Sequence, residues 1–308
     1  MTDIARRLTP CIAGLLVLGF IHNAQAVEGK QHTKGKLLYE STMGGPAAVK
    51  GWRMEGPGEV TFKDGWMRMF SPGKKMHHVY WCPKTFPGSF IAEWEARNLD
   101  PSAGLCIVFF AAKGVGGEDI FDPKLPKRDG TFAQYTRGRI GSYHISYYAN
   151  APHNPNRAHA NLRKNNMFAL VQKGKIGIPT DSVKPHKLRL VKDGPRIVMF
   201  VEDRKIIDWT DDGKTHGPPH ADGKIGFRQM KWTRFRYRNF RVWELRSGQA
   251  NTEAGKAVDR PATASPTSVS TFESIGIYWK ADPDAQEGYC AVRYRAKGAG
   301  EWREGLPL

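Results

Sequence analysis

The sequence predicts an all-β protein whose antiparallel strands form a sandwich or a barrel. First, residues Gly88–Arg97 alternate between apolar and polar side chains, as in a strand with one buried face. Second, the run Leu105–Ala112 is continuously apolar, as in a strand buried on both faces. Third, short strand-like segments punctuated by Gly and Pro recur without helical periodicity between them. This pattern excludes an alternating α/β fold and favours a sandwich or a barrel.

The first 26 residues have the pattern of a secretory signal peptide. Arg6 and Arg7 supply a basic start, and Cys11–Ile21 form a short apolar core. Ala24-Gln25-Ala26 then matches the small-x-small cleavage pattern. We therefore expect a secreted or periplasmic protein that begins at Val27 and has no membrane segment after cleavage. An uncleaved amphipathic anchor is the alternative.

The remaining strands of the main domain are expected in order along the chain. Ser142–Asn150 is rich in β-branched and aromatic residues, as strands are. Residues 188–191 and 197–201 flank Lys192-Asp193-Gly194-Pro195, where the glycine suits a tight turn, so this pair is predicted to be a hairpin. Further strands are predicted at Lys205–Trp209, Lys224–Arg228 and Thr233–Leu245.

The last of these strands contains an irregularity. Phe235 and Tyr237 share one parity, whereas Phe240 and Val242 take the other. A strand of period two cannot turn both pairs inward without a slip, so a bulge or a sharp twist is predicted near Asn239.

The chain divides into a main domain and a short tail. Residues 27–246 hold the predicted strands of the sandwich, and Ser247–Pro266 is small, polar and proline-containing, as linkers are. Residues 267–308 contain two strand-like segments, Ser274–Trp279 and Tyr289–Tyr294. We expect a short, incomplete β tail after the linker.

The main domain is strongly basic. The chain has 47 Lys and Arg against 30 Asp and Glu, a net charge of +17. The signal segment carries a net charge of +1 and residues 261–308 one of −1, so the excess lies in residues 27–260. Such a surface attracts polyanions. The segment Lys231–Arg241 interleaves bases with aromatics as nucleic-acid binders do, but the export signal argues against nucleic acid.

The run from Lys36 to Leu245 resembles the YesU-like family of bacterial proteins. The resemblance rests on ordered segments that include His78-Val-Tyr-Trp-Cys-Pro, Ala92-Glu-Trp-Glu, Gly104-Leu-Cys-Ile-Val-Phe-Phe-Ala-Ala, Tyr143-His-Ile-Ser-Tyr-Tyr-Ala-Asn, Asn161-Leu-Arg-Lys-Asn and Lys224-Ile-Gly-Phe-Arg-Gln-Met. It implies the concanavalin A-like lectin/glucanase jelly roll and a setting of polysaccharide use. The tail resembles the opening strands of a fibronectin type III domain, with Trp279 as its core aromatic. It is too short for the roughly 100 residues of such a sandwich.

One pair of candidate catalytic residues is Glu93 and Glu95, with Arg97 continuing the row toward the substrate. Residues two apart on a strand project from the same face. Two carboxylates that flank a glycosidic bond are the usual equipment of a glycoside hydrolase. The alternative is an ordinary solvated strand face.

A second candidate group suits β-elimination of a uronic-acid polymer. His144, Tyr148 and Asn150 are expected on one strand face, with Gln134 and Tyr135 contributing to substrate binding. The histidine and tyrosine would abstract and deliver protons. The alternative is a set of core tyrosines with one hydrogen-bonded histidine.

A third candidate group would bind the acidic groups of the substrate. Arg157, His159, Asn161, Arg163 and Lys164 lie in a stretch with the composition of a loop, and Arg228 and Gln229 could join them. Guanidinium and ammonium groups bind carboxylate and sulfate and stabilise the charge that develops during elimination. The alternative is a solvated basic loop.

The sequence thus predicts a protein that binds an acidic, uronate- or sulfate-bearing polysaccharide and cleaves it, by β-elimination or by hydrolysis. The alternative is a non-catalytic carbohydrate-binding module. We expect that the protein does not bind nucleic acid and that it is a monomer.

No cofactor or metal site is predicted. Glu118, Asp119 and Asp122 supply only part of the six to eight oxygens that calcium needs, so we expect them to form salt bridges, with calcium as the alternative. After cleavage Cys82, Cys106 and Cys290 remain. A Cys82–Cys106 disulfide and two buried thiols are both compatible with the pattern.

Overall fold

A computed structural model describes residues 32–247 together with four short strands of the tail, 267–270, 275–278, 293–294 and 303–304. The chain divides into two units at residue 250. In the second unit, β16 (Thr267–Ser270) pairs with β17 (Ile275–Tyr278), and β18 (Arg293–Tyr294) pairs with β19 (Arg303–Glu304), all antiparallel. The signal segment and most of the linker lie outside the described residues. The fibronectin-like character of the tail stays a prediction.

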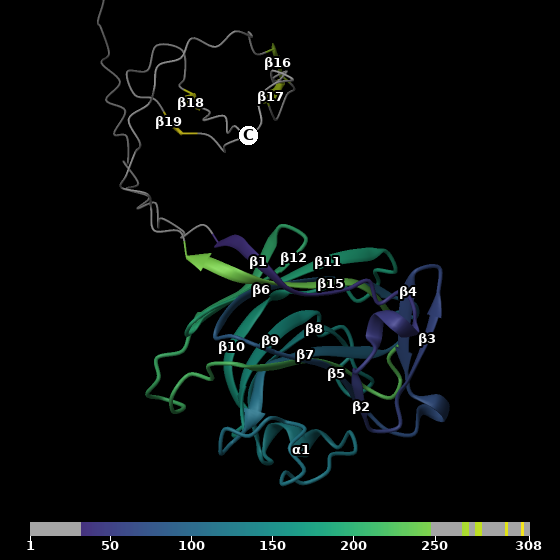
Figure 1. Cartoon of the computed structure of the whole chain (residues 1–308). Coiled ribbons are helices and arrows are strands. Elements are labelled where there is room, and N and C mark those ends of the chain that lie inside the picture. The colour runs from purple at the N-terminus through teal and green to yellow at the C-terminus, as the bar shows by residue number, and fades with distance from the viewer. Residues whose placement is uncertain (1–31, 248–266, 271–274, 279–292, 295–302, 305–308) are drawn as a thin grey trace, which may run out of the picture. The chain divides into compact units, whose positions relative to one another are not determined.

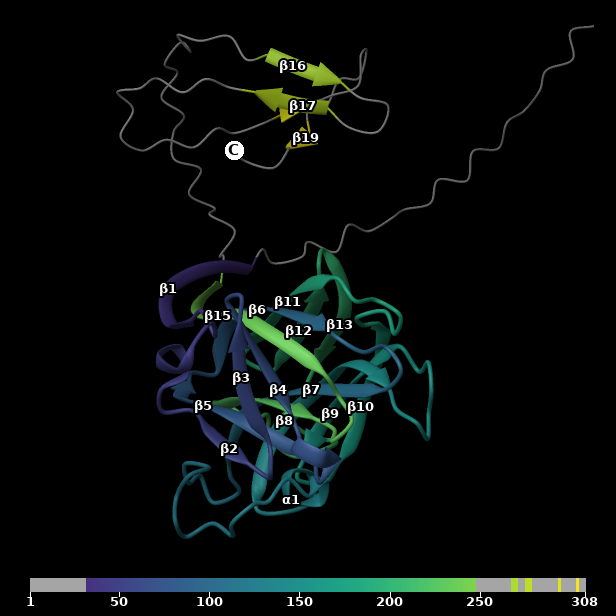
Figure 2. The same cartoon turned by 90° about the vertical axis from the view of Figure 1, so that its right-hand side faces the viewer.

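The first unit is a sandwich of two antiparallel sheets (Figures 1 and 2). In the eight-stranded sheet A the order is β13-β12-β11-β6-β15-β4-β3, and β1 also pairs with β15. Its strands are β1 (His32–Ser41), β3 (Glu59–Lys63), β4 (Trp66–Phe70), β6 (Ser89–Asn98), β11 (Pro185–Asp193), β12 (Arg196–Val201), β13 (Arg204–Thr210) and β15 (Phe235–Ser247). This architecture confirms the predicted all-β, antiparallel sandwich.

The seven-stranded sheet B has the order β10-β9-β8-β7-β14-β5-β2. Its strands are β2 (Arg53–Glu55), β5 (His78–Phe86), β7 (Gly104–Gly114), β8 (Ile140–Asn150), β9 (His159–Asn165), β10 (Ala169–Ile176) and β14 (Gly223–Gln229). The described helices are the short η1 (Pro46–Val49), η2 (Pro72–Lys74) and α1 (Phe132–Thr136). None of the described helices is both long and apolar enough to cross a membrane.

The core lies between the inner faces of the two sheets. From β6, the alternating residues Phe90, Ala92, Trp94 and Ala96 enter it, as predicted. Strand β7 is buried on both faces, also as predicted, because its outer residues Ile107 and Phe109 lie beneath residues 115–139, which carry α1 (Figure 1). We call the face of each sheet that is turned away from the core its outer face.

Two predicted backbone features are confirmed. The hairpin joins β11 and β12 in regular register from Leu188–Val201 to Asp193–Arg196, and Gly194 has a φ of 55°. In β15 the register with β6 slips between Arg238 and Arg241, and Asn239 has a φ of 55°. This bulge lets Phe235 and Tyr237 before it, and Phe240 and Val242 after it, all enter the core.

A second bulge, for which the sequence carries no hydrophobic signal, lies in β8. Cys106 of β7 pairs with Tyr148, but the next residue, Ile107, pairs with Ser146, so Tyr147 is the extra residue. Both Tyr147 and Tyr148 belong to the core. The expectation that Tyr148 and Asn150 share a face with His144 is therefore wrong, because the bulge inverts the parity of the strand between them.

The disulfide alternative for Cys82 and Cys106 is wrong, because both are free, buried thiols. They lie on β5 and β7, which are separated by β14, so their backbones are two strand spacings, roughly 9.5 Å, apart. A disulfide needs Cα atoms within about 7 Å. Burial raises the pKa of Cys82 to about 12, which leaves this thiol protonated.

Candidate functional site

The structure distributes the predicted site residues over four places. The outer face of sheet A carries Glu93, Glu95 and Arg97. The outer face of sheet B carries His144, Asn161, Arg163 and Arg228. The others are Tyr148, Asn150, Lys164 and Gln229, which are buried on the core side of sheet B, and Gln134 and Tyr135 in α1.

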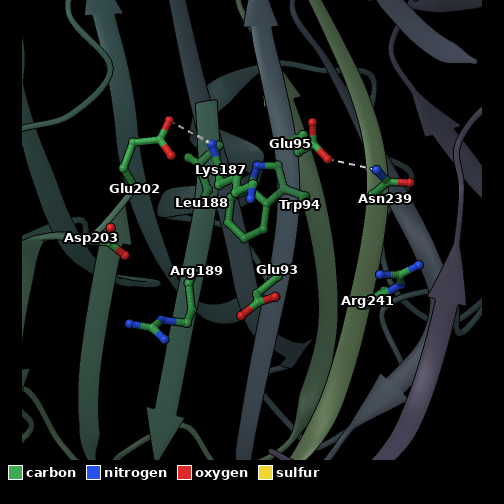
Figure 3. A pocket seen from close by; sticks show the side chains of 10 residues that line it. All are labelled: Glu93, Trp94, Glu95, Lys187, Leu188, Arg189, Glu202, Asp203, Asn239 and Arg241. Atoms are coloured by element: carbon green, nitrogen blue, oxygen red, sulfur yellow. Dashed lines mark hydrogen bonds between the residues drawn. The ribbon is translucent and has the colours of Figure 1, made fainter. Parts of the chain in front are cut away.

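On sheet A, the two glutamates line an open pocket of about 480 Å³ (Figure 3). Each carboxylate already has cationic partners on this face. Lys34 Nζ lies 2.8 Å from Glu93 Oε2, and Arg238 donates two hydrogen bonds to Glu95 Oε2, at 2.8 and 2.7 Å. The Asn239 amide donates a further bond to Glu95 Oε1 at 2.8 Å, so the bulge of β15 also positions this carboxylate.

This pairing determines what the glutamates can do chemically. Partial burial acts to raise the pKa of Glu95, but the hydrogen bonds from Arg238 and Asn239 outweigh it and hold the pKa below its usual value. A glycosidase acid must instead be protonated near neutral pH. Arg97 donates through Nε to the Val183 carbonyl at 2.9 Å. The arrangement is that of cross-strand ion pairs, which supports the alternative of a charged strand face.

The four predicted residues on the core side of sheet B hold the fold together. Tyr148 accepts a hydrogen bond from Asn98 Nδ2 at 2.9 Å and donates one to the Thr180 carbonyl at 3.0 Å. Burial raises its pKa to about 12, so it is a poor general base. Asn150 donates to the Pro101 carbonyl at 2.7 Å.

Lys164 and Gln229 were expected to line the substrate site beside Arg163 and Arg228, and this expectation is wrong. Residues 159–165 form strand β9 instead of the expected loop, and neighbouring residues of a strand face opposite sides. Lys164 therefore points away from Arg163 and forms a buried ion pair with Asp211 at 2.7 Å. Gln229 lies 3.0 Å from the Tyr237 hydroxyl within the core.

The two residues in α1 shape the covering segment itself. Gln134 Oε1 accepts a hydrogen bond from the Asp129 backbone N–H at 2.9 Å, and the Tyr135 hydroxyl accepts one from the Gly130 N–H at 3.2 Å. Tyr135 is buried beneath the segment, against Trp81 and Phe109. Neither side chain lines the pocket on sheet B.

The outer face of sheet B holds a pocket of about 150 Å³ beside residues 115–139. One wall is apolar and aromatic. It consists of Leu105, Ile107, Phe132, Ala149, Ala151 and Phe168. The other wall is polar and consists of His144, Ser146, His153, Asn154, Arg157, Asn161 and Arg163. Of the predicted residues, His144, Arg157, Asn161 and Arg163 thus meet in one place.

The polar wall is held in position by a small hydrogen-bond network. Arg157 donates to Ser146 Oγ at 2.9 Å and to the side-chain oxygen of Asn161. Arg163 donates to the Phe168 carbonyl at 2.9 Å, and its guanidinium lies over the Phe168 ring, 4.0 Å from the centroid. Phe132 and Phe168 had no signal in the sequence, because Phe132 begins the short helix α1 and Phe168 lies in a turn, and the position of both over β8 and β9 depends on the tertiary fold.

The guanidinium groups at this pocket have no carboxylate partner within residues 32–247. Burial lowers the pKa of Arg157, and the nearby guanidinium of Arg163 lowers it further. Burial also lowers the pKa of Arg163, and the nearby guanidinium of Arg137 lowers it further. Behind the pocket, Arg228 is fully buried, and burial lowers its pKa to about 10. It donates to the Gly130 carbonyl at 3.1 Å and lies over the Phe132 ring, while its Nε and Nη2 lack partners. Unpaired buried cations are costly, so this group of arginines is suited to receive an anion.

His144 lies between the arginines and the aromatic wall. Its Nδ1 is 3.0 Å from Asn165 Nδ2, and its ring packs against Phe109, Phe132 and Phe168. Burial, followed by the charges of Arg163 and Arg228, lowers the pKa of His144 to about 3. The imidazole is therefore neutral under ordinary conditions and can take part in a hydrogen bond without adding charge.

The predicted acidic trio forms local structure. Asp119 lies 3.0 Å from Lys224 Nζ and accepts a hydrogen bond from the Phe121 N–H. Asp122 accepts from the Lys124 N–H at 2.8 Å, and Glu118 from the Gly116 N–H at 2.9 Å. In the part of the chain that the structure describes, no three His, Cys, Asp or Glu side chains gather in a group that could hold a metal ion.

The fold and this pocket together define a lectin-like β-sandwich with a cationic, aromatic-walled site on one outer face. A solved structure from Bacillus subtilis, described as a protein of unknown function with a galectin-like fold, matches with a TM-score of 0.65 and 36% identity, over 70% of this chain and 99% of that one. The uncharacterized protein YesU of Bacillus subtilis (strain 168) is 39% identical over 215 residues, 68% of this chain and 97% of that protein. The family model described as a domain of unknown function, DUF1961, matches residues 36–242. The chain belongs to this family, and the resemblance to YesU is confirmed.

Proposed function

We propose that this protein binds an acidic saccharide, bearing uronate or sulfate groups, through the pocket on the outer face of sheet B. The observation that carries the proposal is the group formed by Arg157, Arg163 and Arg228, which has no carboxylate partner among the described residues. Two of these guanidinium groups line a pocket with Phe132 and Phe168, and the third lies directly behind Phe132. A planar guanidinium group can donate two parallel hydrogen bonds to one carboxylate or sulfate group. An aromatic wall suits the apolar face of a sugar ring.

Three further features support this proposal. The galectin-like sandwich of the related structure is a fold on which saccharide sites occur, although the fold alone does not determine function. The net charge of +17 raises the local concentration of a polyanion. The signal-like start indicates that the mature chain, from Val27, works in the periplasm or outside the cell, where polysaccharides are met.

The geometry supports binding better than cleavage. Glu93 and Glu95 are ion-paired on the other outer face, and Tyr148 is buried on the core side of sheet B. Of the groups that were expected to perform hydrolysis or elimination, only His144 lines the pocket of Arg157 and Arg163, and its pKa of about 3 makes it a weak base. Of the two predicted functions, we retain the non-catalytic carbohydrate-binding module.

A panel of uronate-bearing, sulfated and neutral oligosaccharides tests the proposal. Isothermal titration calorimetry on the mature full chain should show binding to acidic members and none to their neutral counterparts. The same incubations should show no increase in near-ultraviolet absorbance, which elimination produces, and no new reducing ends, which hydrolysis produces. Binding of neutral and acidic sugars with equal affinity would refute the proposal, and a product of either kind would restore the enzymatic one.

In a His153→Gln variant, which removes the other histidine of the polar wall, the affinity for an acidic saccharide should change little between pH 5 and pH 8. Arginines stay protonated throughout this range, and His144, with a pKa of about 3, stays neutral. A uronate carboxylate and a sulfate also stay ionised there. Titrations at three pH values measure this directly. An affinity that rises as the pH falls through 6.5 would show instead that a protonated histidine binds the anion.

A further inference from the structure

The outer face of sheet A carries a second group of cations, at the end where β6 finishes. Arg97 of β6, Arg236 of β15 and Arg68 of β4 lie directly opposite one another on three adjacent strands. Neighbouring strands are about 4.8 Å apart, so the three residues form a short row. Like charges that face each other across strands are destabilising, so a row of this kind points to a role other than stability.

Beside this row is a pocket of about 280 Å³ whose rim holds Lys74, Lys231 and Arg234. Three N–H groups at this place are buried without a hydrogen-bond partner: Arg68 Nε, Arg236 Nε and Trp232 Nε1. Among the described residues of this surface, one cation forms a salt bridge with a carboxylate: Arg234 lies 3.5 Å from Asp100. Unpaired N–H groups thus lie just beneath a surface that has an excess of positive charge, which an oxyanion would neutralise.

We propose that this surface, which we call the arginine row (Arg68, Arg97 and Arg236 with Trp232), is a second binding site for the same class of acidic polysaccharide. The inference rests on the proposed function for its ligand class, and it adds a second place of contact. The two sites meet at one end of the sandwich. Leu105 lines the pocket on sheet B, Thr233 lines the pocket beside the row, and the Leu105 N–H donates to Thr233 Oγ1 at 2.9 Å. A long chain can therefore pass from one site to the other around this end.

The aromatic residues of the arginine row favour a saccharide over a nucleic acid. Single-stranded nucleic acids stack their bases on a series of accessible aromatic faces. Here Arg68 lies over the Phe70 ring, 4.6 Å from its centroid, and Trp232 packs against His77 with ring centroids 5.6 Å apart. The surface thus offers guanidinium charge rather than a stacking platform, which suits sulfate or carboxylate groups repeated along an extended chain.

The experiment compares a sulfated tetrasaccharide with a polymer of the same repeat, by calorimetry over a range of NaCl concentrations. In the mature full chain, the double variant Arg68→Gln/Arg236→Gln is expected to bind the polymer about tenfold more weakly. The slope of the logarithm of its affinity against the logarithm of the NaCl concentration is expected to be shallower by about two. Its affinity for the tetrasaccharide should be unchanged, because the short ligand occupies the pocket on sheet B. Each single variant should reduce the salt slope by about one unit.

The matched control is Lys187→Gln/Arg189→Gln, which removes two positive charges elsewhere on the same face. An equal loss in this control, or no loss in the arginine-row variant at a wild-type melting temperature, would overturn the inference. Displacement of the polymer from the row by an oligodeoxythymidine of equal charge at lower concentration would assign the row to nucleic acid instead. The two proposals can also be told apart. If Arg157→Gln/Arg163→Gln leaves tetrasaccharide binding intact while the arginine-row variant still binds the polymer more weakly, the pocket on sheet B is refuted as the saccharide site and the arginine row is supported.

Discussion

Replacing both Arg157 and Arg163 by glutamine is expected to lower the affinity for an acidic oligosaccharide by about 100-fold or more. Each guanidinium would contribute a charge-assisted hydrogen bond worth about 1.5–3 kcal/mol, and every 1.4 kcal/mol changes affinity tenfold. The same change should leave the free energy of unfolding within about 1 kcal/mol of wild type, because removing repulsion between neighbouring cations offsets the lost contacts to Ser146 and Phe168.

Calorimetry on the mature chain measures the affinity, and denaturant unfolding measures the stability. Lys187→Gln/Arg189→Gln serves as the control again, since it removes the same charge from the opposite face and should reduce affinity only slightly through the general field. An Arg157→Gln/Arg163→Gln protein that binds as tightly as wild type would eliminate the pocket on sheet B as the site. A loss of several kcal/mol of stability would show that the two arginines are structural.

Asp211→Asn is expected to lower the free energy of unfolding by about 3–5 kcal/mol, because it leaves the buried Lys164 ammonium without its counter-ion. The side chains of Lys164 and Asp211 are only 2% and 1% exposed and lie 2.7 Å apart. The Tyr143 hydroxyl also donates to Asp211, and Lys164 donates to the Gly217 carbonyl, so the pair joins β8, β9 and the loop after β13.

The control for this change is Asp208→Asn, whose carboxylate is 28% exposed and pairs with Arg196 and Lys205 on the surface. Exposed pairs contribute about 0–1 kcal/mol, so this variant should unfold nearly as the wild type does. Urea denaturation of the two variants gives the comparison. Equal losses in the free energy of unfolding for Asp208→Asn and Asp211→Asn would show that the buried Lys164–Asp211 pair stabilises the fold no more than an exposed pair does.

The contribution of Asp211 also has a defined pH dependence. Burial acts to raise its pKa, but hydrogen bonds from Lys164 and Tyr143 prevail and hold the folded-state pKa below the usual value. A carboxyl group with a lowered folded pKa stabilises the protein above its unfolded pKa of about 3.9. This stabilisation is lost as the pH falls through the folded value. The difference between wild type and Asp211→Asn should therefore shrink below about pH 4.

Much of the fold could be predicted because strand signals are local. Alternation in β6, the continuous apolar run of β7 and the glycine turn between β11 and β12 each depend on a few neighbouring residues. The bulge at Asn239 was also readable, since two pairs of aromatic or aliphatic residues of opposite parity must both reach the core. Here the hydrophobic pattern itself required the irregularity.

The candidate site was predicted only in part. His144, Asn161 and Arg163 do converge, but Tyr148 does not join them, because the bulge at Tyr147 changes the parity of β8 without leaving a mark in the hydrophobic pattern. Lys164 and Gln229 were assigned by adjacency in sequence to Arg163 and Arg228, yet adjacent residues on a strand face opposite sides of the sheet.

By itself, then, the sequence determined that the chain forms antiparallel strands, which residues of most strands are buried, and that the domain is cationic. Only the tertiary structure decided that Glu93 and Arg163 lie on opposite outer faces, and that Arg97, Arg236 and Arg68 form a row. The physical reason is that side-chain periodicity assigns a residue to one of two faces of its own strand. Which strands become neighbours, and which outer face each sheet presents, depends on contacts between residues far apart in the chain.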